Sequence, residues 1–397
     1  MTLRIDAPFM HRRRTSRRTF VRAAAAAAVA LGAPWVVRSQ GPLSLRFRTI
    51  PDPDGWQPSL RLKGDWLVVE IGDGALSGFG EASHSNDDER CKETAARLFA
   101  EHYASFALSL DNLARKEREI AALIPDFVTA TAFSALNQAL YDLLAKREQV
   151  PVWRLFTDTT AIEGIPLYTT INRALRMRDA ADYSVVVGEL RAQGFKTFKC
   201  APFEAVNGPD NAVAQSAAGL ATLERLRDEF PDLAVRVDFH ERFRPQDFFE
   251  LLPALERLQL DWLEEPFAVG PAYAELKRRT RLRLAAGELF WGRRRFEEIA
   301  AQGWVHVIMP DVKHVGGFGP LLDVLQMAAG RIEVSPHNPS GPISTAASLH
   351  AAAVHPQLVR SIEYSFDRMQ TRRSTGETVA NGTLLLTDEP GWGVAPA

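Results

Sequence analysis

Residues 235–243 read VRVDFHERF, a stretch in which an acid and a histidine follow directly on a short strand. Asp238 and His240 are two positions apart, so on an extended chain their side chains point to the same side. A carboxylate and an imidazole aimed at one place indicate that this strand ends at a functional site. The neighbouring segments show whether other strands end in the same way.

Eight strand-like segments alternate with amphipathic helical segments between residues 165 and 365. The helical segments include FFELLPALERL at 248–258 and GPLLDVLQMAAG at 319–330. The strand-like segments are 165–171, 195–201, 233–239, 260–266, 282–288, 305–311, 332–338 and 359–365. Such alternation predicts parallel pairing, because a parallel return needs a crossover, and eight units close into a (β/α)₈ barrel.

Polar residues near the ends of six of these segments recur at a regular interval. They are Asp238, Glu264, Glu288, Asp311, His337 and Glu363. Their numbers differ by 26, 24, 23, 26 and 26, about the length that one strand, one helix and two loops need. Since barrel enzymes carry their chemistry at the C-terminal ends of the strands, we predict a ring of side chains around one mouth.

The part of the chain before the barrel has a different pattern. Residues 44–84 alternate and turn as short strands do, and residues 88–156 have helical spacing, ending in SALNQALYDLLAKREQVPVWRLF. Strands followed by helices predict a small α+β domain. We therefore assign residues 41–160 to this domain and residues 161–364 to the barrel.

Composition excludes several classes of protein. Apolar residues make up 46% and charged residues 24% of the 397 residues, as in ordinary soluble proteins. A net charge of −2 argues against a nucleic acid or an anionic membrane surface as partner. The two cysteines, Cys91 and Cys200, form neither a disulfide framework nor a metal cluster.

The N-terminus has the pattern of an export signal. Residues 11–37, HRRRTSRRTFVRAAAAAAVALGAPWVV, begin basic and continue as an alanine-rich apolar run, which is about half of the ~20 residues that a membrane span needs. Ser16 to Val21 resemble a bacterial twin-arginine signal. We therefore predict that residues 1–40 direct the protein to the periplasm, with no membrane association after their removal; a basic tail and an uncleaved anchor are the alternatives.

Three acids of the ring predict a metal site. Asp238, Glu288 and one of the pair Glu264 and Glu265 offer oxygen ligands alone, a set that favours Mg²⁺. Zinc would more often recruit histidine or cysteine. The pattern alone does not decide between Glu264 and Glu265, because two successive acids cannot both face the barrel axis.

The remaining members of the ring suit proton transfer beside a carboxylate. His240 and His337 would stand on opposite sides of the metal, and Asp311 could hold His337 as a general base. Lys199, near the end of the second strand, is a cation for a substrate carboxylate. Lys313 and His314 are further candidates, whereas His306 is predicted to be a strand residue without a catalytic role.

Together these motifs resemble the enolase superfamily, specifically its mandelate racemase/muconate lactonizing enzyme group. The resemblance implies a modified barrel, an α+β capping domain and a C-terminal segment, residues 365–397, that returns to that domain. VDFH, WLEEP and AAGEL resemble the metal-ligand strands, which implies that Asp238, Glu264 and Glu288 bind Mg²⁺. MPDVKHVGG and SPHNPSGPIS resemble the strands of its Asp–His base, Asp311 and His337, and SIEYS supplies Glu363, the acid that helps to hold the enolate.

The second strand departs from the racemases of this group. They carry Lys-x-Lys there, the second lysine being a base on the opposite face, whereas this chain has Lys199 followed by Cys200 and Ala201. Lys196 does not replace it, because its spacing of three puts it on the other side of the strand. His240 instead makes the third strand similar to that of the galactonate-type sugar-acid dehydratases, which implies that His240 protonates a leaving 3-hydroxyl while His337 removes the 2-proton.

The sequence therefore predicts a Mg²⁺-dependent aldonate or uronate dehydratase that yields a 2-keto-3-deoxy acid. One alternative is a racemase or epimerase with His240 or Lys313 as second base, and another is a non-catalytic periplasmic binding protein. Relatives imply a homo-oligomer. The substrate itself is not predicted, although Trp56, His84 and Arg90 lie in loops where specificity is expected.

Overall fold

The computed structural model describes residues 42–51, 65–208, 211–366 and 371–396. The predicted export signal and Trp56 lie outside the described residues. Within those ranges, helices of the length and apolarity that a bilayer crossing requires do not occur.

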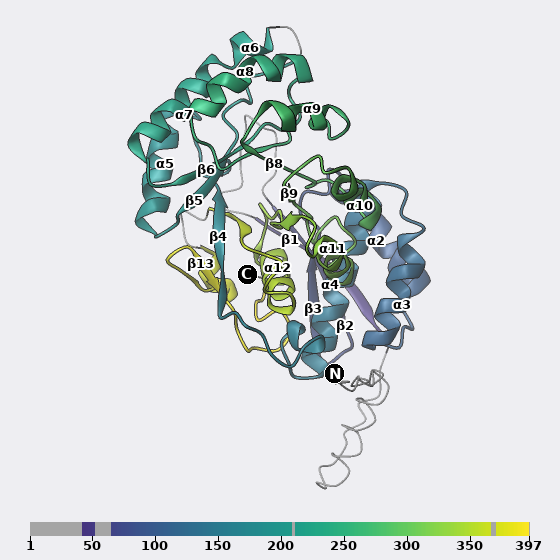
Figure 1. Ribbon diagram of the computed structural model, residues 1–397. Coiled ribbons are helices and arrows are strands. Elements are labelled where there is room, and N and C mark those ends of the chain that lie inside the picture. The colour runs from purple at the N-terminus through teal and green to yellow at the C-terminus, as the bar shows by residue number, and fades with distance from the viewer. Residues whose placement is uncertain (1–41, 52–64, 209–210, 367–370, 397) are drawn as a thin grey trace, which may run out of the picture. The chain divides into compact units, whose positions relative to one another are not determined.

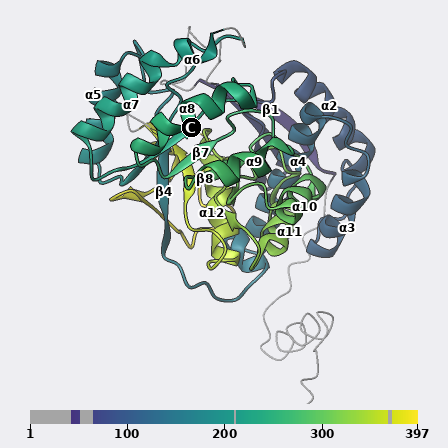
Figure 2. The ribbon, with the colours of Figure 1, turned by 45° about the horizontal axis from the view of Figure 1, so that its top comes forward.

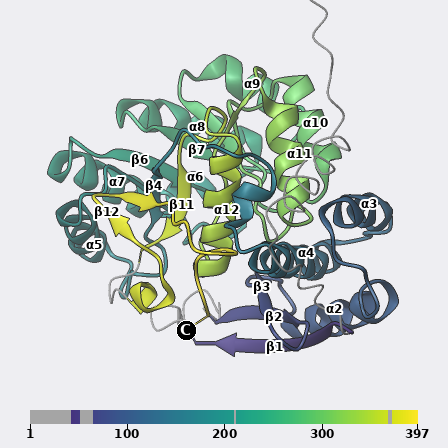
Figure 3. The same ribbon diagram turned by 90° about the horizontal axis from the view of Figure 1, so that it is seen from below.

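The N-terminal domain is a three-stranded antiparallel sheet with three helices on one side (Figure 3). The strands lie in the order β1 (Ser44–Ile50), β2 (Trp66–Gly72) and β3 (Ser77–Glu81). The helices are α2 (Asp88–His102), α3 (Leu110–Ala121) and α4 (Phe127–Arg147). Asp87, Ser109 and Asp126 begin the three helices, each accepting a hydrogen bond from a backbone N–H of the first turn.

Close contact between α4 and β3 holds this domain together. Every residue of α4 from Val128 to Ala145 is buried, as expected of a helix enclosed on all sides. A Cβ atom on Gly78 would lie 2.1 Å from the carbonyl oxygen of Ala139, and one on Gly80 would lie 2.0 Å from that of Ala135. Glycine on the strand and alanine on the helix therefore allow the two backbones to meet.

All eight predicted barrel segments contain a strand. The strands are β4 (Gly164–Thr170), β5 (Thr197–Cys200), β6 (Ala234–Asp238), β7 (Trp262–Glu264), β8 (Arg283–Ala286), β9 (Val307–Ile308), β10 (Glu333–Val334) and β11 (Ile362–Ser365). Neighbours from β4 to β10 pair in parallel in chain order, and β11 pairs in parallel with β4.

Helices lie outside these strands (Figure 1; Figure 2). They are α5 (Ala180–Ala192), α6 (Ala212–Gln215), α7 (Ala217–Glu229), α8 (Pro245–Arg257), α9 (Ala272–Arg279), α10 (Arg293–Gln302), α11 (Phe318–Ala328) and α12 (Pro342–Val354). Residues on or next to four of the barrel strands form a separate buried cluster, Tyr168, Trp262, Ala285, Val307 and Met309, and the Arg236 guanidinium lies 3.6 Å from the Trp262 ring centroid. The architecture confirms the predicted barrel fold and its N-terminal domain.

The barrel differs from a fully closed one between β10 and β11. Among the described residues, this seam is joined by an isolated parallel bridge from Val334 to Val359 and not by a ladder. Pro336, two residues after β10, has no N–H to continue a ladder, although its carbonyl accepts the Glu363 N–H at 3.1 Å.

The chain after the barrel packs against both parts of the fold. Strands β12 (Val379–Ala380) and β13 (Thr383–Leu385) form a hairpin, and β13 pairs antiparallel with β4. The Trp392 indole donates a hydrogen bond to the Phe79 carbonyl at 2.9 Å, and its backbone N–H donates to Asp142 at 2.8 Å. Short 3₁₀ turns occur at Val152–Leu155 and Thr371–Thr375.

We expect Gly80→Ala to destabilise the protein by roughly 1–3 kcal/mol, because the added methyl group meets helix backbone that cannot rotate away. Gly270→Ala is the matched control, since nothing lies within 4 Å of its added Cβ. Urea unfolding of both variants measures the difference. Equal stability of the two variants would contradict the close contact between α4 and β3.

A buried acid at the junction of α3, α4 and α11 predicts a pH-dependent stability. The carboxylate of Glu117 accepts hydrogen bonds from Asn137 at 2.7 Å and Tyr141 at 2.9 Å, yet burial raises its pKa from 4.5 to about 7. The folded state therefore retains a proton that the unfolded state loses above pH 4.5. Glu117 thus costs stability as the pH rises from 4.5 towards 7, by roughly 3 kcal/mol at the upper end.

We expect Glu117→Gln to remove this cost, because glutamine still offers an oxygen to Asn137 and Tyr141. The stability of the variant relative to the natural protein should rise between pH 5 and pH 8, as urea unfolding at each pH would show. A difference that is constant with pH would refute the assignment.

Candidate active site

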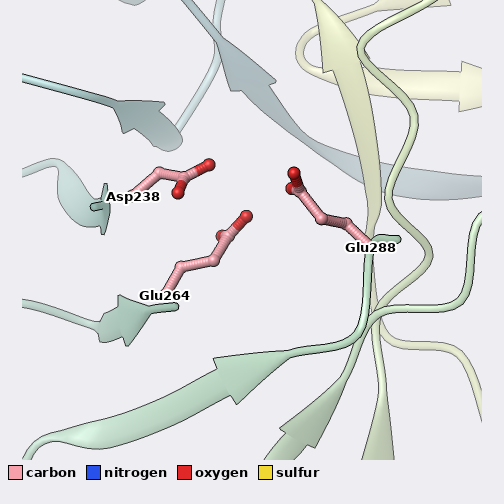
Figure 4. A group of neighbouring side chains, drawn as sticks. All are labelled: Asp238, Glu264 and Glu288. Atoms are coloured by element: carbon pink, nitrogen blue, oxygen red, sulfur yellow. The ribbon is translucent and has the colours of Figure 1, made fainter. Parts of the chain in front are cut away.

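Three of the predicted acids converge at the C-terminal ends of adjacent strands (Figure 4). Asp238 is the last residue of β6, Glu264 is the last of β7, and Glu288 follows the end of β8 by two residues. Each offers a carboxylate oxygen within 4.8 Å of the others. We call these three residues the acidic triad.

The structure distinguishes the two successive acids of WLEEP. The Glu264 side chain is completely buried in the triad and accepts a hydrogen bond from the Trp262 indole at 3.0 Å. Glu265 has a backbone φ of 40° and accepts a hydrogen bond from the Gly287 N–H at 2.7 Å, outside the triad. Burial and the charge on Glu288 raise the pKa of Glu265 to about 8.

Lys199 meets four carboxylates at once. Its ammonium lies 2.5 Å from Glu264, 3.0 Å from Glu363, 3.2 Å from Asp238 and 3.8 Å from Glu288. Burial alone would lower the pKa of Lys199, but the carboxylates, led by Glu264, raise it well above its usual value. Lys199 therefore stays charged inside the site.

The acidic triad fits a hard divalent cation. Four carboxylates, of which all but Glu288 are fully buried, surround one ammonium. If all four were ionised beside neutral imidazoles, three negative charges would be uncompensated. Burial together with the charge on Asp238 raises the pKa of Glu264 well above its usual value, a sign that these acids repel one another in a low-dielectric site. Oxygen ligands of this kind are those that Mg²⁺ prefers.

Asp311 and His337 form a hydrogen-bonded pair on the other side of the triad. Nδ1 of His337 lies 2.8 Å from Asp311, and its Nε2 lies 3.1 Å from Glu288. Burial alone would lower the pKa of His337, but Glu288, Glu363 and Asp311 together raise it to about 10. The same Asp311 oxygen also accepts from the buried Lys313 ammonium at 2.6 Å, so the pair is anchored by a third side chain.

His240 reaches the triad from the side of β6. Its Nε2 lies 3.2 Å from Asp238, which outweighs the effect of burial and raises the pKa of His240 to about 9. The local geometry differs from the predicted extended chain, because β6 ends at Asp238 and His240 has a φ of 48°. The imidazole is 35% exposed, against 8% for His337, so it is the more open of the two.

Glu363 is held by two residues that the sequence did not single out. Its carboxylate accepts from the Tyr168 hydroxyl at 3.2 Å and from the Asn338 N–H at 3.3 Å. Tyr168 lies opposite Glu363 in the register of β4 and β11. Asn338 adjoins His337 in sequence, and this adjacency was the one available signal for either residue.

The other predicted positions divide into two groups. His84 is near the site: it contacts Arg173 and lies 3.2 Å from the Ser340 hydroxyl. Burial and then the charges of Arg173 and Lys313 lower its pKa well below the usual value. By contrast, Arg90 pairs with Asp126 on the surface, and His306 accepts the Leu284 N–H at 3.0 Å within the strand region.

Comparison with known proteins gives matches along both parts of the chain. Residues 61–157 match the mandelate racemase / muconate lactonizing enzyme N-terminal domain, and residues 182–397 match the enolase C-terminal domain-like family. A D-galactonate dehydratase of Klebsiella pneumoniae (strain 342) is 30% identical over 227 residues, which cover 56% of this chain and 58% of that protein. The matched region thus spans less than two thirds of this relative.

Solved structures share the fold. A mandelate racemase/muconate lactonizing enzyme-like protein of Rubrobacter xylanophilus DSM 9941 has a TM-score of 0.76 and 22% identity, covering 90% of this chain and 95% of that one. The 3,6-anhydro-D-galactonate cycloisomerase of Zobellia galactanivorans has a TM-score of 0.74 and 20% identity, covering 89% and 97%. With the family matches over both domains, the chain belongs to the enolase superfamily, in its mandelate racemase/muconate lactonizing enzyme group.

Proposed function

We propose that the protein is a Mg²⁺-dependent dehydratase of aldonic or uronic acids. The observation that carries this proposal is the pair of imidazoles flanking the acidic triad. His337 contacts Glu288 after β10, and His240 contacts Asp238 after β6. Removal of a proton at one carbon and protonation of a leaving hydroxyl at the next require two such groups.

In this proposal His337 is the base and His240 is the acid. Asp311 occupies Nδ1 of His337, so Nε2 is the atom directed at a substrate proton. His240 is the more exposed imidazole and is protonated beside Asp238, as a proton donor must be. Asp238, Glu264 and Glu288 would hold Mg²⁺, which when bound would stabilise the developing enolate and would offset the effect of the Glu288 charge on the pKa of His337.

Lys199 would stabilise the charge that develops on the substrate carboxylate, and Glu363, in its acid form, would donate a hydrogen bond to the enolate. Both are buried and lie 3.0 Å apart. Tyr168 and Asn338 fix Glu363 from two sides, so the group does not have to reorganise during the reaction.

The second strand favours elimination over racemisation or epimerisation, in which a proton is exchanged between the two faces of the substrate. Ala201 stands where a second base would be needed and has no ionisable group. Lys313, the other candidate, is completely buried and is engaged by Asp311 at 2.6 Å. The similarity to a D-galactonate dehydratase supports the same choice.

We expect that, among aldonic and uronic acids incubated with the protein and Mg²⁺, at least one yields a 2-keto product detectable with semicarbazide. Binding of an acid without product would instead support the binding-protein alternative. No turnover of any acid by protein that binds Mg²⁺ would overturn the proposal.

The two imidazoles can be separated by substitution. We expect His337→Asn to abolish both product formation and entry of deuterium at C2 in D₂O, because the base is lost. His240→Asn should lower product formation by about 10²–10³-fold yet keep deuterium entry at C2, because His337 remains. Recovery of inverted, deuterated substrate from the natural protein would favour an epimerase instead.

We also propose that residues 1–40 export the folded protein to the periplasm. The support is the pair Arg17 and Arg18 before Thr19-Phe20-Val21 and the alanine run. We expect Arg17→Lys with Arg18→Lys to leave the full chain in the cytoplasm of a bacterium with twin-arginine export. Arg12→Lys with Arg13→Lys is the matched control and should leave export intact; equal periplasmic fractions of both variants would refute the proposal.

A further inference from the structure

Two barrel helices begin directly after the loops that carry the Asp311–His337 pair. Helix α11 starts at Phe318, seven residues after Asp311, and α12 starts at Pro342, five residues after His337. The N-cap residues are Gly317 and Gly341, so neither helix has a capping side chain at its own N-cap. The first N–H groups of a helix need acceptors from elsewhere.

The N-terminal domain supplies these acceptors to both helices. Glu81, the last residue of β3, accepts from the Gly341 N–H at 2.7 Å and the Ser344 N–H at 3.0 Å. From α4, Asn137 accepts the Phe318 N–H at 2.7 Å. Both loops of the pair are therefore fixed at one end by a strand and at the other by the N-terminal domain.

The N-terminal domain leaves no space for a side chain at these two glycine N-caps. A Cβ atom on Gly317 would lie 2.2 Å from Oδ1 of Asn137, and one on Gly341 would lie 2.9 Å from the Glu81 carboxylate. A side chain at either position would displace the acceptor. The contact thus depends on glycine at these two barrel positions as well as on the side chains of the N-terminal domain.

Contacts continue from Glu81 to the reacting groups. The Ser344 hydroxyl lies 3.1 Å from Glu81 and 2.7 Å from Oδ1 of Asn338. The Asn338 N–H in turn donates to Glu363. An unbroken path of polar contacts therefore joins a carboxylate of the N-terminal domain to the residue beside His337.

We infer that Glu81 is a positioning residue, which holds the loop of His337 and Asn338 in register with Asp311 and Glu363. This inference rests on the proposed function only for the catalytic role of the pair. A carboxylate at a helix N-terminus is favoured by the helix dipole as well as by its hydrogen bonds. Loss of that carboxylate should move the loop, and displacements of about 1 Å at a reacting group can cost about 100-fold in rate.

Glu81→Gln tests this, because glutamine preserves size but turns one acceptor oxygen into a donor facing helix N–H groups. Asp142→Asn on α4 is the matched control. Asp142 is also fully buried and also accepts two backbone N–H groups, from Phe79 and Trp392, each at 2.8 Å, but neither belongs to the loops of the pair. Both variants therefore lose one buried acceptor, but only Glu81→Gln should disturb the Asp311–His337 pair.

In the full chain with Mg²⁺, we expect Glu81→Gln to lower kcat by at least about 10-fold with little change in KM. Asp142→Asn should leave kcat within about twofold when both are assayed well below their melting temperatures. If Glu81→Gln does not fold, Ser344→Ala, which removes the hydroxyl but keeps the helix, should lower kcat several-fold.

A spectroscopic measurement keeps the inference independent of substrate turnover. The imidazole N–H proton of His337 that faces Asp311, identified by its absence in His337→Asn, should shift or broaden in the proton NMR spectrum of Glu81→Gln and stay unchanged in Asp142→Asn. If no acid is turned over, the proposed function fails while this test still stands. Identical spectra and matching kcat values for the two variants would overturn the inference.

Discussion

Repulsion among buried carboxylates is the constraint on which this structure depends. Asp238, Glu264, Glu288 and Glu363 gather around Lys199, and burial of so many acids is costly unless cations accompany them. One ammonium and two imidazoles nearly balance them only while both imidazoles are protonated. A neutral His337, which the proposed role as base requires, would leave a deficit of positive charge that a divalent cation would offset. The proposed metal site and the proposed base therefore depend on the same charge balance.

Much of this arrangement was predictable, because strand–helix units repeat at a nearly constant length. The interval between successive polar residues placed six side chains at one mouth, and the eight predicted segments all contain a strand. Spacing did not distinguish Glu264 from Glu265, since adjacent residues fit the interval equally well. The family resemblance made that choice, and a positive φ at Glu265 accounts for it in the structure.

The rest depends on contacts that no local pattern encodes. His240 lies in a turn and not in the extended conformation. The strand alternation that predicted the direction of its side chain therefore does not apply there, and that direction was correct only by coincidence. Tyr168 reaches Glu363 across 195 residues of chain, and Glu81 reaches Gly341 across 260. Such pairs follow from which strands and helices meet in space, and a tyrosine or glutamate in a strand has the same local appearance whether or not it makes such a contact.

The seam between β10 and β11 connects these observations. Backbone pairing holds the other barrel strands in register, but here Pro336 interrupts the ladder, and His337 and Asn338 follow at once. A loop freed from the ladder can bring an imidazole and a backbone N–H towards the axis, at the expense of its own rigidity. Glu81 of the N-terminal domain fixes the far end of this loop through the N–H and hydroxyl groups of Ser344 on α12. The N-terminal domain thus contributes to the positioning of this loop, because its Glu81 carboxylate accepts the Gly341 and Ser344 N–H groups at the start of α12.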